Sequence, residues 1–185
     1  MDFFCYHRDR AGSLPLRQEL LEEHWSYMDR FAEQMIARGP AFEDGDEGAG
    51  LRGSVHILSV VDVAAARDFA FAEPGWQAGV YRDVMLRRWR NDLGRTMWEF
   101  PDGPPDGDEY LVLALGVSAP VAEAVGPESV DGLIAYGPLL SDDGQTWVGT
   151  VALLRAPNRD AARAVVNAGR YTEIEVHSWE FGGRR

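Results

Sequence analysis

Histidine is the residue type that most directly suggests acid–base chemistry in this chain, because its side chain titrates near neutral pH. The 185 residues contain four histidines: His7, His24, His56 and His177. His24 lies in a segment whose apolar residues recur every three or four positions, at Leu16, Leu20, Tyr27, Phe31 and Met35. This spacing is typical of a helix face that packs on a sheet, so His24 is expected to point inward.

An inward-facing histidine either satisfies the core through hydrogen bonds or acts as an acid–base group whose surroundings set its pKa. A carboxylate bound to one ring nitrogen would fix the tautomer and raise the basicity of the other nitrogen. Three acidic residues could take that place: Glu73, which precedes Pro74, and Asp29 and Glu22 on the same predicted helix. The residues alone leave both roles of His24 open.

Other side chains are candidates for holding a substrate. His7 and Arg8 stand where the first predicted strand ends, and Arg52 lies in a later strand. A guanidinium group can bind an oxyanion or a carboxylate, although a solvated ion pair explains such residues equally well. Trp76 is one of several tryptophans in the first half that could wall an apolar pocket or fill a core. His56 lies in mid-strand, and alternation does not say which face it takes.

Composition excludes several classes of function. All 18 basic residues are Arg and none is Lys, which excludes Schiff-base chemistry on a lysine amine. The 30 acidic residues give a net charge of −12, which argues against binding a nucleic-acid backbone. The single Cys5, the start without a leader pattern and the lack of a long apolar run predict a cytoplasmic protein without a membrane span.

Searches for cofactor and metal motifs find no pattern that predicts either. The chain has no glycine-rich nucleotide loop, no nucleophile elbow and no multi-Cys or His-x-x-x-His spacing. The acidic run 43–48, with Asp44, Asp46 and Glu47, lacks the spacing of a calcium loop and predicts a solvated turn. We therefore expect no cofactor and no metal.

Short patterns recur across the chain and indicate a degenerate tandem repeat. The Ile-Ala-x-Gly-Pro pattern at 36–40 returns at 134–138, and the strand pattern at 53–58 returns at 149–154. A stretch dense in Pro, Gly and Asp joins the repeats. We predict a first lobe over residues 1–100, a linker over 101–107 and a second lobe over 108–185.

Each lobe is expected to alternate strands and helices. The first lobe reads as strands at 2–7, 51–61 and 79–89, a helix at 63–72, and a long helix from Ser13 that Gly39-Pro40 closes. The second lobe has strands at 109–116, 146–155 and 171–181, a helix at 159–168, and a first helix that Gly126-Pro127 disrupts. With a short strand after each Gly-Pro, this predicts an α+β fold of two ferredoxin-like (βαββαβ) lobes. Their uncovered sheet faces would pair as an intramolecular pseudo-dimer or two-fold barrel.

The first lobe resembles the YCII (YciI-like) family. The resemblance rests on the aromatic first strand, the helix segment Glu22-Glu23-His24-Trp25-Ser26-Tyr27-Met28, and the segment Glu73-Pro74-Gly75-Trp76-Gln77-Ala78-Gly79-Val80-Tyr81. It implies a dimeric α/β-barrel fold related to muconolactone isomerase, and a His–Asp pair lining a cleft, with a dehydrochlorinase-type lyase among the members. The family histidine falls on His24. The family aspartate falls on Glu73, whose carboxylate stands one methylene further from the backbone.

The second lobe lacks both residues, because Ala122 and Gly169 occupy the repeat positions of His24 and Glu73. One site per chain is therefore expected, with the second lobe as scaffold. We predict a small enzyme of the isomerase, lyase or cyclase type that moves protons on an apolar or aromatic oxygenated molecule, with His24 and Glu73 as the catalytic pair. The alternative is a binding or structural protein without turnover. We expect either kind of protein to be a monomer, with its two lobes paired as a pseudo-dimer, or a homodimer.

Overall fold

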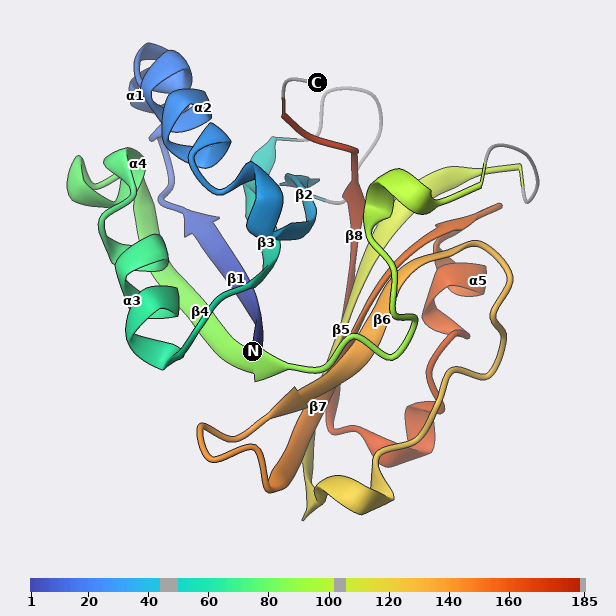
Figure 1. The fold of residues 1–185 in the computed structure, drawn as a ribbon. Coiled ribbons are helices and arrows are strands. Elements are labelled where there is room, and N and C mark those ends of the chain that lie inside the picture. Colours follow the sequence, from blue (N-terminus) through green and yellow to red (C-terminus); the bar gives the residue numbers. More distant parts are fainter. Residues whose placement is uncertain (44–49, 102–105, 184–185) are drawn as a thin grey trace.

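Eight antiparallel strands form a closed barrel over the described residues, 1–43, 50–101 and 106–183, of this computed structural model (Figure 1). The strands are β1 (Asp2–Asp9), β2 (Met35–Phe42), β3 (Leu51–Ser59), β4 (Tyr81–Trp89), β5 (Asp108–Pro120), β6 (Leu133–Leu140), β7 (Thr146–Ala156) and β8 (Glu173–Trp179). The α-helices are α1 (Leu14–Glu19), α2 (Leu21–Asp29), α3 (Val63–Phe71), α4 (Pro74–Gln77) and α5 (Arg159–Arg163). Short 3-10 turns cover Ala32–Gln34, Met97–Glu99, Val121–Glu123 and Ala168–Arg170.

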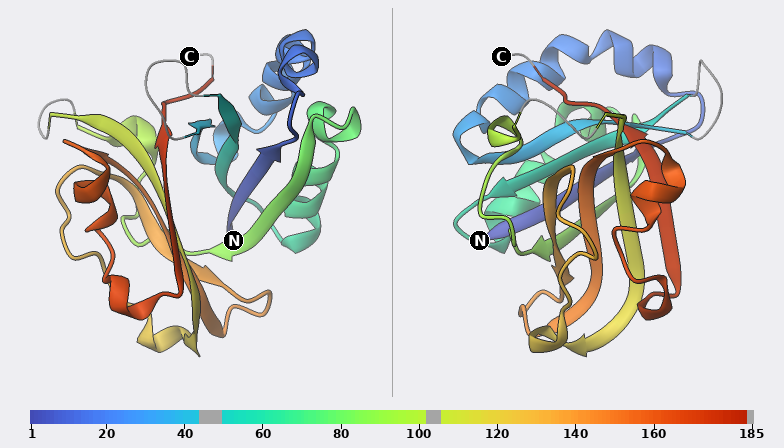
Figure 2. Two further views of the ribbon diagram at one scale, coloured as in Figure 1. Left: turned by 180° about the vertical axis from the view of Figure 1, so that it is seen from behind. Right: turned by 90° about the vertical axis from the view of Figure 1, so that its right-hand side faces the viewer.

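The two halves of the chain contribute contiguous arcs of the barrel with the same strand order. Around the barrel the first half runs β4-β1-β3-β2 and the second runs β8-β5-β7-β6. Helices α1 to α4 cover the outer face of the first arc, and α5 covers the second (Figures 1 and 2). The α+β class is confirmed, with strands dominating and few helices. Two separate lobes with a pseudo-dimer relationship stay a prediction.

Strand alternation sorts the apolar side chains between the barrel interior and the helix-covered outer faces. In β1, Phe4 and Tyr6 point into the barrel, while Phe3 and Cys5 lie under the helices. The interior contains residues from both halves, so the two arcs share one core. In β3, Val55 belongs to the interior, and His56 therefore faces the helices. This resolves the orientation of His56 that alternation alone left open.

The two arcs join at two seams of the same construction. Strand β2 pairs with β8 through Ala41 and Trp179, and β4 pairs with β6 through Trp89 and Leu139. In each seam the tryptophan covers a glycine, and a Cβ on that glycine would lie 2.8 Å from a ring atom and would overlap a backbone oxygen. Those glycines, Gly39 and Gly137, are the glycines of the repeated Gly-Pro pattern.

The long helix predicted up to Gly39-Pro40 is wrong. The helix is interrupted at Leu20 and ends at Asp29, and Gly39-Pro40 lies inside strand β2. The short strand predicted after Gly39-Pro40 also differs, because strand β2 contains this pair. In the same way, strand β6 contains the second pair, Gly137-Pro138. The glycine is required because Trp179 and the Glu180 carbonyl approach the strand closely at Gly39, and no helix ends there.

The remaining predicted elements form with shifted ends. The helix predicted at 159–168 is shorter, because only Arg159–Arg163 is α-helical. Between β5 and β6 the described chain has a 3-10 turn, Val121–Glu123, in place of the disrupted helix. The acidic turn with Asp44, Asp46 and Glu47, and most of the predicted linker, lie outside the described residues. No helix within the described ranges is long and apolar enough to cross a membrane.

Replacing Gly137 with Ala should weaken the seam between β4 and β6. The added methyl group would overlap the Arg90 carbonyl, which belongs to the backbone and cannot swing away. We expect a loss of about 1–3 kcal/mol in the free energy of unfolding, measured by urea denaturation. Gly126→Ala is the matched control, because a Cβ at that position would meet nothing within 4 Å. Equal stability of both variants would contradict this role of the seam glycine.

Candidate active site

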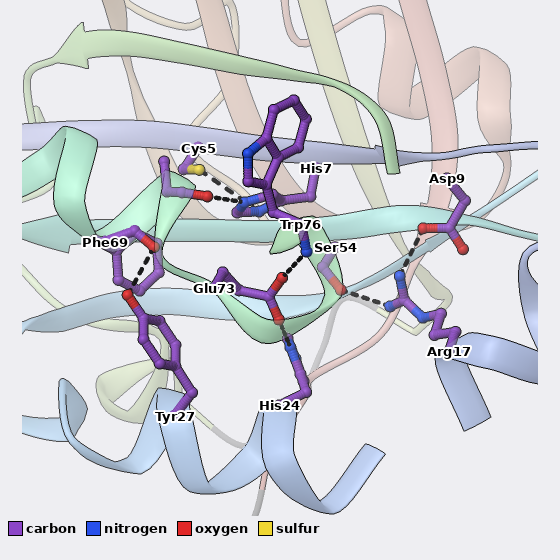
Figure 3. A network of polar contacts seen from close by, with 11 residues as sticks. Cys5, His7, Asp9, Arg17, His24, Tyr27, Ser54, Phe69, Glu73 and Trp76 are labelled. Carbon is purple, nitrogen blue, oxygen red and sulfur yellow. Dashed lines mark hydrogen bonds and ion pairs between the residues drawn. The ribbon is translucent and has the colours of Figure 1, made fainter. Parts of the chain in front are cut away.

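His24 and Glu73 form a hydrogen-bonded pair between two elements. Nδ1 of His24, in α2, lies 2.8 Å from Oε1 of Glu73, which precedes α4 (Figure 3). The Glu73 side chain is completely buried, and the His24 side chain is 17% exposed. Of the three acidic residues that the sequence offered, Glu73 is the one that holds Nδ1. The other ring nitrogen of His24, Nε2, takes no part in this hydrogen bond.

The start of helix α4 fixes Glu73 in place. Pro74 occupies the first helical turn, where its missing N–H has no cost, and Glu73 is the N-cap. Its second oxygen, Oε2, accepts a hydrogen bond of 2.7 Å from the backbone N–H of Trp76. Gly75 is needed because a Cβ there would come within 3.0 Å of this carboxylate and of the Tyr81 ring. Both oxygens of Glu73 are therefore fixed before any ligand arrives.

Electrostatics keep Glu73 ionised at neutral pH. Burial raises the pKa of Glu73, but the hydrogen bond and charge of His24 and the Trp76 N–H together bring this pKa below its usual value. An ionised carboxylate accepts a hydrogen bond from the Nδ1–H of His24, which leaves Nε2 as the ring nitrogen that can accept a proton. The pair can therefore take up a proton at Nε2 and return it.

Two further histidines lie behind His24. His7 is buried, and its Nε2 donates to the Ala70 carbonyl at 2.8 Å. The ring centre of His56 lies 5.8 Å from those of His7 and His24. Burial lowers the pKa of His7 and lowers that of His56 well below its usual range, so both rings are neutral at neutral pH. Nδ1 of His56 has no hydrogen-bond partner among the described residues.

A cavity of about 310 Å³ lies beside His24, a volume within the range of small-molecule sites. The first helical segments, the strands β2 and β3 and the tail after β8 enclose it. Helical residues on its wall are Arg17, Leu21, His24, Trp25 and Met28, and strand residues are Arg38, Gly39, Pro40, Phe42, Leu51, Ser54 and His56. The tail contributes Phe181, Gly182 and Gly183.

Two guanidinium groups reach this cavity. Arg17 donates to Asp9 at 2.6 Å and to the Ser54 hydroxyl at 2.5 Å. Burial raises the pKa of Asp9 to about 6, against the opposing charge of Arg17. The Arg38 side chain is only 7% exposed, and its Nη1 lies 3.8 Å from Oδ1 of Asp29. The cavity is thus lined by two arginines in addition to its apolar side chains.

The four predicted substrate-binding residues do not line the cavity. His7 is buried behind it rather than at an open strand end. Arg8 forms an ion pair of 2.6 Å with Asp83, and Arg52 lies 4.0 Å from Glu43. The Trp76 ring packs against Phe71, and its contribution to the site is the backbone N–H that holds Glu73.

The sequence reasoning missed Arg17, Arg38 and the tail. Arg17 had a signal, because Arg17, Leu21, His24 and Met28 recur with helical spacing and share a face. That face lies beside the apolar face that the prediction followed. Phe181, Gly182 and Gly183 had no local signal, and they show that the second half is more than a scaffold, since it supplies part of the cavity wall.

A second histidine–carboxylate pair lies away from the cavity. Nε2 of His177 is 2.9 Å from Oε2 of Glu175 on β8, and neither residue lines the cavity beside His24. Within the part of the chain that the structure describes, no three His, Cys, Asp or Glu residues are grouped so as to hold a metal ion.

Residues 1–90 match the model of the YCII-related domain. Among solved structures, 5-chloro-2-hydroxyhydroquinone dehydrochlorinase from Burkholderia phenoliruptrix AC1100, in complex with 2,5-dihydroxybenzoquinone, is 24% identical over 51% of this chain and 99% of its own, with a TM-score of 0.47. A candidate monooxygenase from Lactobacillus acidophilus NCFM is 8% identical over 97% of this chain and 92% of its own, with a TM-score of 0.46. No curated protein matched the chain.

Replacing Glu73 with Gln should change how stability depends on pH. Because the folded state lowers the pKa of Glu73, its ionised form stabilises the fold fully above the unfolded pKa of about 4.3. This stabilisation is lost as the pH falls through the lower, folded pKa. We expect Glu73→Gln to cost about 1–3 kcal/mol at pH 7 and less in acid, measured by urea unfolding across pH.

The exposed Glu23 on α2 provides the control, since Glu23→Gln makes the same chemical change without burial. A stability difference between wild type and Glu73→Gln that stays constant from neutral pH into acid would contradict the ionised, buried carboxylate.

Proposed function

We propose that the chain is a small enzyme that moves protons on an apolar or aromatic, oxygenated small molecule without a cofactor. One observation carries this proposal: His24 is held at Nδ1 by a buried, ionised Glu73 and at the same time lines a cavity of ligand size. A histidine that only satisfied a core would need no such opening. The match of residues 1–90 to the YCII-related domain agrees with a site in this half.

The proposed chemistry uses Nε2 of His24 as base and then as acid. It accepts a proton from a C–H or O–H group of the substrate, and Glu73 stabilises the imidazolium ion that results. In an isomerisation or cyclisation the same proton returns to another atom of the molecule. In an elimination it leaves with the departing group. Cavity walls of Leu21, Trp25 and Met28 would exclude water around these steps.

We further propose that the two halves arose by tandem duplication and that one chain forms the whole barrel. Two features support this: the halves have the same strand order, and Gly39 and Gly137 have the same role at the two seams. Residues of β1 to β4 thus find in β5 to β8 the sheet partner that a single unit would need from a second chain.

Exchange of substrate hydrogens with solvent tests the proposed proton transfer without knowledge of the natural product. A panel of hydroxylated aromatics and enolisable cyclic ketones would be incubated in deuterated water and followed by proton NMR. For a compound that the wild type exchanges, we expect His24→Gln to lower the rate by about 10²–10⁴-fold. Glu73→Gln should lower it at least about tenfold, because the ring loses its orientation and its charge partner.

His177→Gln is the matched control, since it removes a histidine with a carboxylate partner at 2.9 Å that does not line the cavity. We expect this variant to exchange at the wild-type rate, with circular dichroism confirming the fold of each variant. Exchange that persists in His24→Gln contradicts the mechanism, and a panel with no exchange above buffer favours a binding protein without turnover.

A further inference from the structure

The cavity beside His24 differs in charge from the rest of the molecule. The chain as a whole carries a net charge of −12. Among the described residues that line this cavity, two are arginines and none is Asp or Glu. Acidic proteins gain nothing in solubility from a cationic recess, and a buried guanidinium has a desolvation cost. The arrangement therefore points to a ligand with negative charge.

Both guanidinium groups are placed around His56. Arg38 on β2 is the direct cross-strand partner of His56 on β3, so their side chains leave the sheet on the same face. Arg17 binds the hydroxyl of Ser54, which is two residues from His56 and shares that face. The His56 ring is 5.8 Å from that of His24. The cations and the proposed base thus surround the same volume.

The electrostatic surroundings of His56 include both arginines. Burial is the main reason that the pKa of His56 falls, and the charges of His24 and His7, followed by those of Arg17 and Arg38, lower this pKa further. The ring stays neutral, so it adds no charge of its own. A negative group in the cavity would meet the arginines and a neutral imidazole.

We propose that the cavity selects a flat organic anion, an aromatic carboxylate or phenolate, with Arg38 as the main anchor of the charged group and Arg17 beside it. The choice of Arg38 follows from its surroundings. Arg38 is the direct cross-strand partner of His56 and its side chain is only 7% exposed, whereas Arg17 reaches this face through the hydroxyl of Ser54. A guanidinium matches a carboxylate in shape, and burial strengthens the attraction.

Apolar walls would hold the ring of such an anion. Trp25 and Met28 on α2 and Phe181 of the tail line the same cavity as the arginines. An anion anchored at Arg38 would present its ring to His24 from within this apolar part. Negative charge that develops when the ring loses a proton would also be stabilised by the arginines. The inference rests on the proposed function only in taking this cavity as the substrate site.

Calorimetric titration with matched probes tests the anion preference. Benzoate and naphthoate would be compared with benzamide and naphthamide, which have nearly the same shape without the charge. At neutral pH we expect the wild type to bind a carboxylate at least about tenfold more tightly than its amide. Arg38→Met should weaken carboxylate binding about tenfold or more and leave amide binding within about twofold.

Three further variants make the result specific. Arg17→Met should weaken carboxylate binding by less than Arg38→Met, and Arg38→Lys should retain part of it by keeping the charge without the fork. Arg90→Met is the control for loss of one positive charge, because Arg90 pairs with Asp92 at the surface and does not line the cavity. Unfolding curves of each variant establish that it is folded.

Equal affinity for a carboxylate and its amide would overturn the proposal, as would an Arg38→Met variant that binds like Arg90→Met. The absence of saturable carboxylate binding up to about 1 mM would also overturn it. Binding is measured without turnover, so the two proposals fail separately. Proton exchange can be absent while naphthoate binds, and exchange on neutral compounds can continue while the anion preference is refuted.

Discussion

Closure of the barrel depends on two tryptophans that lie against two glycines. In each seam between the arcs, only two residues of one strand pair with two residues of the other. Neighbouring strands within an arc are joined by many more residue pairs. The rings of Trp179 and Trp89 lie over Gly39 and Gly137 and are almost completely buried there. A closed barrel has no free strand edges, and that state is reached here through these two contacts. Burial of the shared interior follows from them.

The seam of β2 and β8 also completes the candidate site. The chain that leaves Trp179 crosses Gly39, and the Gly182 N–H donates to the Arg38 carbonyl at 3.0 Å. This crossing brings Phe181 over the cavity that His24 and Arg38 line. Barrel closure and cavity formation therefore share residues. Residues 1–90, which match the model of the YCII-related domain, hold the proposed catalytic pair, and residues outside this range complete the wall.

Local patterns predicted the parts of the structure that local forces determine. The helical spacing around His24 predicted that this ring points toward the sheet, and the helix predicted at 63–72 forms as Val63–Phe71 with Asp62 as its N-cap. The Gly-Pro pairs were misinterpreted because a helix end and a close strand crossing use the same two residues. The family resemblance selected Glu73 from three carboxylates that spacing alone could not distinguish.

What the sequence could not predict depends on contacts between distant segments. Arg38 was not identified because its cavity position follows from its pairing opposite His56, and pairing partners are not visible in one sequence. Phe181 to Gly183 reach the cavity through barrel closure, which no short pattern encodes. The binding candidates Arg8 and Arg52 failed to reach it because each ends beside a carboxylate at another part of the surface.

One part of the cavity wall, formed by Phe181, Gly182 and Gly183, comes much later in the sequence than the rest. The ribosome synthesises His24 and Glu73 long before Phe181. The part of the wall that Phe181, Gly182 and Gly183 supply is therefore absent while the residues of the histidine–carboxylate pair are already synthesised. Reactive intermediates are protected only where water is excluded. Enclosure of the cavity thus requires residues up to Gly183, whose part of the wall is synthesised last.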